Sequence, residues 1–314
     1  MIVEVNYRKV KSPDFFIVGA GKSGTTSLSR YLSEHPEIYI PDIKEPQFFA
    51  FYGVEYRNNK PKPFSYIKNM EDYFSLFKNA QEYQILGEAS TWYSISYCVD
   101  RAIESIKKFY GEKANNLKFI FIIRNPIERI FSAYVMYVDI GLEDLPFEKA
   151  ISLAKKRIEE GYRLELNYIE NMFISYSVQK YLDTFGKNKV KIYLYEDLRE
   201  NPYWLLRDIF EFLEVDPNFV PSNLDISYNI SGIPKSPVHK FIYNVTVSYN
   251  PLKPIIKKIL PKHTKDKITQ HLRKTLYTKP QMPPEVREKL KEIFKEDILR
   301  LQEFIGRDLT HWLK

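Results

Sequence analysis

The stretch that most constrains the fold is DFFIVGAGKSGTTSLSRYLSEHP, residues 14–36. Its first residues, 14–20, are an apolar run that ends in glycines, as is typical of a buried parallel strand. After Gly24, apolar residues recur on one helical face and Pro36 follows the last of them, which predicts a helix. The order strand, glycine-rich turn, helix predicts a βα unit of an α/β fold, with its turn at the end of the sheet.

The turn of this unit has the composition of an anion-binding site. Glycines allow a close backbone approach, and the free N–H groups and dipole at the start of a helix favour a negative charge. A structural glycine turn with an ordinary helix cap is the alternative reading. The groups that we expect to bind phosphate or sulfate are Lys22, Ser23, Gly24, Thr25, Thr26 and Ser27.

The spacing of this turn differs from that of a nucleoside-triphosphate loop. A Walker A loop reads G-x-x-x-x-G-K-[ST], with its lysine directly after the last glycine. Gly19 and Gly24 have that spacing, but Thr25 follows Gly24 and Lys22 precedes it by two residues. The loop therefore places its cation differently from a loop that binds the β- and γ-phosphates of ATP.

Further strands and helices alternate along the chain. Apolar runs predict strands at 83–90, 117–126 and 189–198, and helical patterns lie at 147–160, 173–186, 201–215 and 283–306. This alternation predicts an α/β fold, a P-loop-like three-layer sandwich with a central, mostly parallel sheet flanked by helices. We expect residues 1–314 to form a single domain.

A second strand–turn–helix unit, FIIRNPIERIFSAY at 121–134, resembles the first. Arg124 leaves the predicted strand and Ser132 lies two helical turns further on, so a cation and a hydroxyl can bind another phosphate. An arginine at a strand end is by itself more often a surface ion-pair partner. Because both units reach the carboxyl ends of parallel strands, we expect them to share one ligand.

The residue composition limits the kinds of site that the chain can contain and bears on its location. The single cysteine, Cys98, excludes an internal disulfide framework and is typical of a small buried residue. His35, beside Pro36 at a helix end, is predicted to lie on the surface. With no apolar run long enough to span a membrane and no secretory signal pattern at the N-terminus, the expected location is cytoplasmic.

The positive charge of the chain is concentrated in one segment. Residues 235–279 hold eleven lysines and arginines and one acid, whereas the whole chain has a formal net charge of +7. A local excess argues against a nucleic-acid-binding surface and for a local anionic partner. The segment 235–280 is expected to form a lid, acceptor-binding or interface element, and 250–274 can be a solvated amphipathic helix or a peripheral membrane contact.

The two strand–turn–helix units together resemble the cofactor signatures of sulfotransferases that use 3′-phosphoadenosine 5′-phosphosulfate (PAPS). KEPQFF at 44–49 and IGRDLTHWL at 305–313 are similar to the branch that contains bacterial and heparan-sulfate sulfotransferases. The resemblance runs from about residue 14 to the C-terminus. It implies a co-substrate, PAPS, whose 5′-phosphosulfate lies on residues 22–27 and whose 3′-phosphate lies on Arg124 and Ser132, with no metal required.

The same resemblance implies roles in catalysis. Lys22 would stabilise the leaving oxygen, and Glu45, just before the Gln-Phe-Phe stretch, would be the base that takes the proton of the acceptor. Glu88 is the second candidate base, because it lies at the carboxyl end of the strand at 83–90 and should face the same crevice. Lys235, in the loop YNISGIPKSPVHK at 228–240, would be a further cation on PAPS or a solvated lysine.

Three functions stay open at this point. The first is transfer of a sulfuryl group from PAPS to a hydroxyl or amine of a glycan, a lipid or a small molecule. The second is a P-loop nucleotide kinase or GTPase, which would require Mg²⁺. The third is a non-catalytic nucleotide-binding protein that uses the basic segment to hold an anionic partner.

Overall fold

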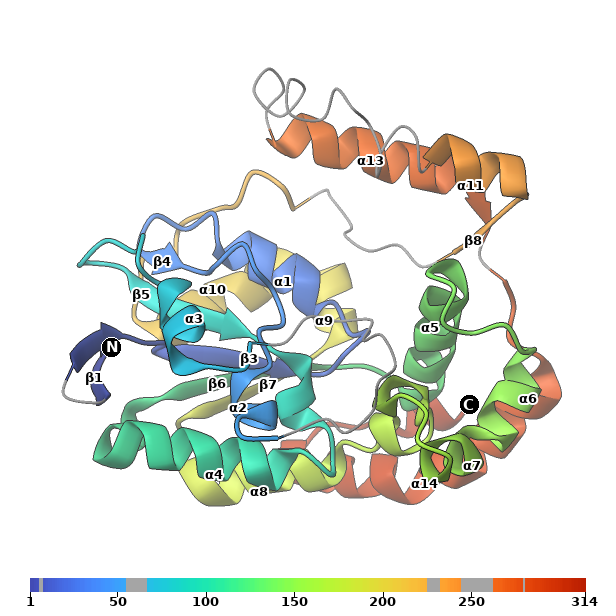
Figure 1. Cartoon of the computed structure of the whole chain (residues 1–314), viewed down its shortest axis with the longest axis horizontal. Coiled ribbons are helices and arrows are strands. Elements are labelled where there is room, and N and C mark those ends of the chain that lie inside the picture. The colour runs from blue at the N-terminus through green and yellow to red at the C-terminus, as the bar shows by residue number, and fades with distance from the viewer. Residues whose placement is uncertain (6–7, 55–66, 225–231, 244–261, 279) are drawn as a thin grey trace.

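A five-stranded parallel sheet forms the centre of the computed structural model, which describes residues 1–5, 8–54, 67–224, 232–243, 262–278 and 280–314 (Figure 1). The first strand of this sheet along the chain lies in its middle, between strands that come later on both sides. Open α/β sheets bind ligands outside the carboxyl ends of the strands at such a reversal. In sheet order the strands are β4 (Ile38–Tyr39), β5 (Ile85–Ala89), β3 (Phe15–Gly19), β6 (Lys118–Ile123) and β7 (Val190–Leu194).

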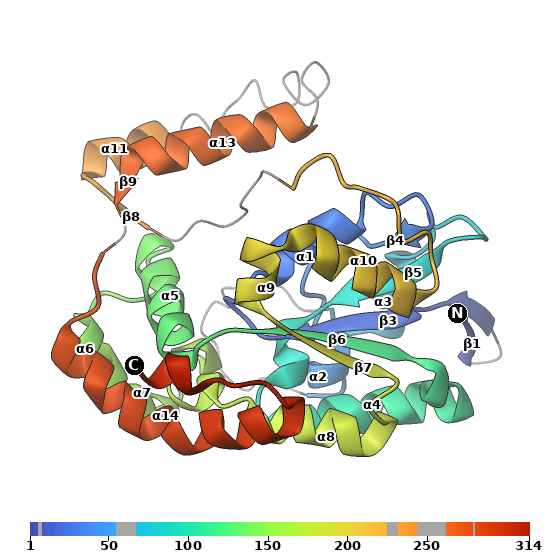
Figure 2. The ribbon, with the colours of Figure 1, turned by 180° about the vertical axis from the view of Figure 1, so that it is seen from behind.

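Alternate residues of the central strands enter two separate cores. Phe16 and Phe119 belong to one apolar cluster, and Ile17 and Ile120 to the other. The helices α4 (Val99–Tyr110) and α8 (Ser175–Phe185) contribute to the first cluster, and α1 (Thr25–Leu32) and α10 (Pro202–Leu213) to the second, so helices cover both faces (Figure 2). The three-layer α/β prediction is confirmed.

The remaining helices connect or buttress these layers. α14 (Pro284–Ile305) packs against α8 and α5 (Pro126–Asp139). The shorter helices are α2 (Phe48–Phe51), α3 (Met70–Ser75), α6 (Phe147–Ser152), α7 (Ala154–Glu159) and α9 (Tyr195–Glu200). Short 3₁₀ turns are η1 (Thr91–Ser94), η2 (Gly111–Asn116), η3 (Leu164–Leu166), η4 (Glu170–Met172) and η6 (Thr310–Leu313).

Two small two-stranded sheets lie outside the central sheet. β1 (Ile2–Val5) pairs with β2 (Arg8–Lys11), and β8 (Ile233–Pro234) pairs with β9 (Tyr277–Thr278), both antiparallel. β8 leads into α11 (Pro237–Tyr243), and β9 receives the chain from α13 (Lys262–Leu276). These two helices lie apart from the sheet layers and next to the end of α5 (Figure 1).

Several sequence predictions need correction. The strand predicted at 189–198 ends at Leu194, because the Asp197 side chain accepts a hydrogen bond from the Leu194 amide (2.9 Å) and α9 begins at Tyr195. The helix predicted at 147–160 is two helices, α6 and α7. The surface position predicted for His35 is wrong: its ring is buried, with centroids 4.7 Å from Phe210 and 4.8 Å from Phe219.

Other expectations have mixed outcomes. Cys98 is buried as predicted, and burial raises the pKa of its thiol to about 12. In the described part of the chain, no helix is long and apolar enough to cross a membrane. Of the stretch 250–274, residues 250–261 lie outside the described residues, so the amphipathic surface expected there stays a prediction, as does the single-domain assignment.

Candidate active site

The loop between β3 and α1 has the form of an anion cradle. Gly24, at the start of α1, has φ +93°, and a Cβ there would lie 2.9 Å from Leu198 Cδ2, so only glycine fits. The N-cap residue of α1 is Gly24 itself, which has no side chain that could cap the helix. Ser23 is fully buried, and its Oγ lacks a hydrogen-bond partner within the described protein. A buried hydroxyl without a partner beside an uncapped helix start fits a phosphate or sulfuryl group.

Lys22 lies in the same loop with an unusual backbone and environment. Its φ is +64°, in the left-handed region, and its Nζ donates to Met136 Sδ of α5 at 3.4 Å. Burial, and after it the charges of Arg124, Arg273 and Lys44, together lower the pKa of Lys22 to about 8. Cations that gather around a lysine in this way form a site for an anion.

The second predicted motif meets the first. Arg124, directly after β6, donates from Nη1 to the Lys22 carbonyl at 3.4 Å, and its guanidinium lies 4.7 Å from the centre of the Tyr195 ring. Glu128 is its ion-pair partner at 3.6 Å. Ser132 is half-buried two turns along α5. The expectation that the two units meet at the carboxyl edge of the sheet is therefore confirmed.

Sequence reasoning missed Arg129, which ties this edge together. It is buried, and it donates to the carbonyls of Gly21 (3.1 Å), Met172 (3.3 Å) and Asn171 (3.4 Å). Burial lowers its pKa to about 10. The only sequence signal was an arginine on the apolar face of a predicted helix. This side chain joins the anion loop to the turn that precedes α8.

Glu45 lies at the same edge, beyond the end of β5. Its amide donates to the Ala89 carbonyl (2.9 Å), and its Oε2 accepts from the Thr91 amide (2.8 Å) and the Thr91 hydroxyl (2.9 Å). Lys44 pairs with the other carboxylate oxygen. The residue has φ +62°, and its side chain is 22% exposed. Glu45 is thus a fixed and accessible carboxylate.

Glu88 lies elsewhere than the sequence led us to expect. It is 1% exposed, and its Oε2 accepts from Tyr73 (2.5 Å) and Tyr93 (3.2 Å) inside the core, rather than facing the crevice. Its register partner on β3 is Phe16, which belongs to the core on that face of the sheet. Burial raises the pKa of Glu88 to about 7, although hydrogen bonds from its neighbours oppose the shift.

Lys235 and Arg273 lie in the segment that runs from β8 to β9. Lys235 is exposed, and its amide donates to the Leu276 carbonyl at the end of α13 (3.0 Å), which places it with α11 and α13. Sequence reasoning did not single out Arg273 of α13, although its charge acts on Lys22.

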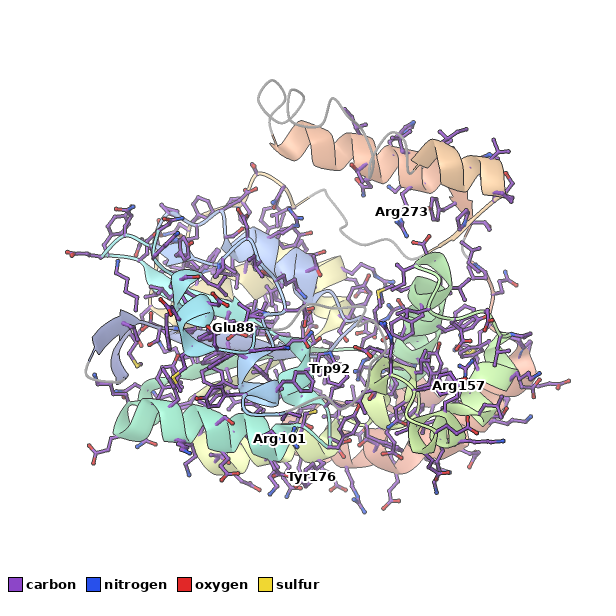
Figure 3. The ribbon with its side chains drawn as sticks, viewed as in Figure 1. Glu88, Trp92, Arg101, Arg157, Tyr176 and Arg273 are labelled. Atoms are coloured by element: carbon purple, nitrogen blue, oxygen red, sulfur yellow. The ribbon has the colours of Figure 1, made fainter. Side chains whose placement is uncertain are left out.

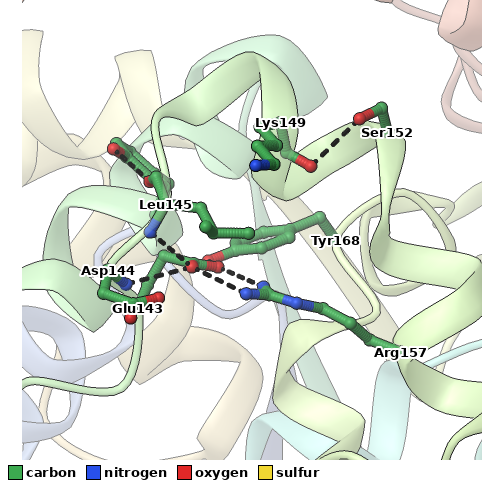
Figure 4. Close-up of polar contacts among 8 residues, drawn as sticks. Glu143, Asp144, Leu145, Lys149, Ser152, Arg157 and Tyr168 are labelled. Carbon is green, nitrogen blue, oxygen red and sulfur yellow. Dashed lines mark hydrogen bonds and ion pairs between the residues drawn. The ribbon is translucent and has the colours of Figure 1, made fainter.

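The segment after α5 is fixed by a buried carboxylate (Figure 4). Glu143 accepts from Arg157 Nη1 (2.6 Å) and Nη2 (3.1 Å), from the Tyr168 hydroxyl (3.0 Å), and from the amides of Asp144 (3.1 Å) and Leu145 (3.0 Å). Burial alone would raise the pKa of Glu143, but these hydrogen bonds lower it overall. A buried network with this many partners holds its segment in one conformation.

Comparison with known proteins decides the family. Residues 13–219, which hold both anion-binding units and Glu45, match the profile described as "Sulfotransferase family". The chain belongs to the sulfotransferase family.

Curated relatives agree with the assignment. The membrane-associated sulfotransferase kil1 of Dictyostelium discoideum is 33% identical over 125 residues, which cover 39% of this chain and 22% of that protein. Human carbohydrate sulfotransferase 15 is 26% identical over 251 residues, covering 65% of this chain and 44% of the relative. The chain thus spans less than half of the length of these two relatives.

Solved structures of sulfotransferases share the fold. A sulfotransferase from Alicyclobacillus acidocaldarius superposes with a TM-score of 0.69 at 28% identity, covering 97% of this chain and all of the other. The mouse sulfotransferase SULT7A1 complexed with PAP has a TM-score of 0.51 at 14% identity, with 95% of this chain and 90% of that one covered. The prediction of a sulfotransferase made from the paired motifs is confirmed.

Proposed function

We propose that this sulfotransferase transfers a sulfuryl group from PAPS to a hydroxyl or amine of an acceptor. The observation that carries the proposal is the meeting of two anion sites, with Arg124 hydrogen-bonded to the Lys22 carbonyl. One bisanionic ligand with a 3′-phosphate and a 5′-phosphosulfate accounts for both. The complex of mouse SULT7A1 with PAP, the desulfated form of PAPS, supports the same ligand.

The site residues divide the work on such a donor. Ser23 and the amides that open α1 would hold the 5′-phosphosulfate, while Arg124 and Ser132 would hold the 3′-phosphate. PAPS supplies the reactive group: the acceptor oxygen or nitrogen bonds to sulfur as the bond from sulfur to the 5′-phosphate oxygen breaks. This transfer depends mainly on positioning and on stabilisation of charge.

Lys22 and Glu45 would stabilise the leaving group and accept the proton of the acceptor. Lys22, with a pKa of about 8, is mostly protonated at neutral pH and would stabilise the oxygen that leaves with PAP. Glu45 would take the proton of the acceptor, because Thr91 and Lys44 fix its carboxylate at the accessible edge of the site. Glu88 is the weaker candidate because it contacts tyrosines in the core.

The acceptor and the location are proposed only in outline. The names of the relatives, carbohydrate sulfotransferase 15 and the heparan sulfate N-deacetylase/N-sulfotransferases, favour a glycan, and a lipid or small-molecule alcohol is the alternative. A peripheral membrane contact through 250–274 is compatible with the name of the membrane-associated relative kil1. A cytoplasmic location stays a prediction.

The first experiment is calorimetric titration with PAP, and with ADP as control, both without magnesium. We expect PAP to bind much more tightly than ADP, and Arg124→Ala to remove most of that preference. Arg207→Ala, an exposed arginine of α10, is the matched control and should leave PAP affinity unchanged. Equal binding of PAP and ADP would contradict the proposal and favour a nucleotide kinase or a non-catalytic binding protein.

A further inference from the structure

Helix α13 is joined to the edge of the site by an ion pair. Arg273 Nη2 pairs with the Asp139 carboxylate at the last residue of α5. The two side chains are only 21% and 11% exposed, and the Arg273 guanidinium lies 4.5 Å from the centre of the Tyr277 ring. Figure 3 shows the side chain of Arg273 pointing from α13 toward α5. The Coulomb attraction between two charges this shielded from water is stronger than that between two charges on an open surface.

Asp139 lies on the face of α5 that the proposed donor site uses. Ser132, Met136 and Asp139 follow one another at spacings of four and three residues, so they share one helical face, and all three are half-buried. Met136 is the residue whose sulfur accepts the Lys22 Nζ hydrogen bond at 3.4 Å. Arg273 therefore lies about one helical turn beyond the contact of Lys22 with α5.

Asp139 and Arg273 place opposite charges near Lys22. A carboxylate beside an anion-binding lysine opposes the binding of an anion unless a cation compensates it. Arg273 compensates Asp139, and its charge also contributes to the low pKa of Lys22, after burial and Arg124 and ahead of Lys44. A guanidinium has five N–H donors in a planar fork, so one side chain can pair with a carboxylate and an oxyanion together.

We propose that Arg273 is a further anion-binding residue of this site, which helps to hold the 5′ end of the donor while Asp139 fixes its position. The inference rests on the proposed function, because it takes the donor to be PAPS. It gives α13, which follows the nucleotide-binding motifs by more than a hundred residues, a direct part in donor binding.

The test uses the opposite charges of the pair. The variants are Arg273→Ala, Asp139→Asn and the double variant, with Lys274→Ala, an exposed neighbour on α13, as the matched control. Dissociation constants of PAPS and PAP are measured by calorimetry without magnesium. We expect Arg273→Ala to weaken PAPS binding about tenfold, as loss of one charge-assisted contact does. Asp139→Asn keeps an acceptor oxygen that positions Arg273 and removes a negative charge, so it should keep or improve affinity. The double variant should recover part of the loss, and Lys274→Ala should change nothing.

A purely structural role gives a different pattern. If the pair only fastens α13 to α5, then Arg273→Ala, Asp139→Asn and the double variant weaken binding equally, and the proposal is overturned. It is also overturned if Arg273→Ala binds PAPS like the wild type. Arg273→Lys, which keeps the charge, should retain more affinity than Arg273→Gln, and this comparison replaces the alanine variant if that variant does not fold.

The controls separate this proposal from the proposed function. If wild-type protein binds PAP no better than ADP, both proposals fall. If the wild type binds PAP tightly, Arg124→Ala abolishes that binding and Arg273→Ala does not weaken it, the proposed function stands and the role of Arg273 alone is refuted.

Discussion

Two carboxylates near the end of β5, Glu45 and Glu88, have opposite surroundings. Glu45 is 22% exposed, paired with Lys44 and hydrogen-bonded by Thr91. Glu88 is 1% exposed and accepts from two tyrosine hydroxyls, and its pKa is raised to about 7. The comparison teaches that distance along the chain from a strand end does not decide which acid can serve a reaction. The place of the acid in the fold decides it: Glu88 lies on the face of β5 that packs into the core, and Glu45 lies in the loop before α2 at the edge of the sheet.

The largest effect is expected from neutralising Glu45. If it is the base, Glu45→Gln lowers kcat by about 10²–10⁴-fold and leaves PAP affinity nearly unchanged, because the proton of the acceptor has no recipient. Sulfation of an acceptor found in a PAPS-based screen measures kcat. Glu82→Gln, an exposed acid, is the control and should match the wild type. A kcat within twofold of wild type for Glu45→Gln would transfer the role to another group.

The second test removes Glu88, the buried one of the two carboxylates. Glu88→Ala leaves a cavity and two tyrosine hydroxyls without their acceptor, so the free energy of unfolding should fall by about 2–4 kcal/mol. Urea denaturation followed by circular dichroism measures it. Glu88→Gln, which keeps an acceptor oxygen, should cost about 1 kcal/mol. A variant with unchanged stability but a hundredfold lower kcat would place Glu88 in the chemistry instead.

The third test follows the titration of Glu88. Its pKa is about 7 in the folded protein against 4.5 for an ordinary glutamate, so the folded state holds a proton that the unfolded state has released. The contribution of Glu88 to stability is present below about pH 4.5 and is lost as pH rises to about 7. The loss is at most about 3 kcal/mol. Denaturation midpoints across this range should fall more steeply for wild type than for Glu88→Gln; parallel curves would refute the shifted pKa.

The smallest effect is expected from the titration of Lys22, which lies in the same site as Glu45. Because Lys22 has a pKa of about 8, its charge is lost above that pH in the ligand-free protein. PAP affinity should be level between pH 7 and 8 and then fall by up to tenfold for each pH unit. Calorimetry at several pH values measures this. Lys22→Ala should bind more weakly and without this slope, and a wild-type profile that is flat to pH 9.5 would contradict the prediction.

Local patterns predicted the parts of the fold that are locally determined. The runs around Phe16 and Phe119 are apolar on both faces, so they revealed the buried parallel strands β3 and β6, and the glycines after β3 revealed the turn into α1. The two-residue strands β4, β8 and β9 carry no periodicity that a sequence pattern can detect. These strands form because the folded chain brings their backbone next to the strand with which each one pairs.

The site was predictable only where its residues follow a strand. Lys22 and Arg124 come shortly after β3 and β6, and the paired motifs located both. Glu45 came from the resemblance to a family and from no local signal. Arg129 and Arg273 act through contacts with carbonyls and carboxylates far away in sequence, and such contacts exist only once the chain has folded.

Lys22 and Glu45 both adopt left-handed backbone angles that residues other than glycine rarely take, with φ of +64° and +62°. Each costs on the order of 1 kcal/mol that glycine would not cost. The side chain at each position must therefore supply something that glycine cannot. For Glu45, part of it is structural, because Thr91 and Lys44 hold the carboxylate and offset the backbone cost. For Lys22, it is an ammonium group held at the start of α1, which a glycine at this position would remove together with the backbone cost.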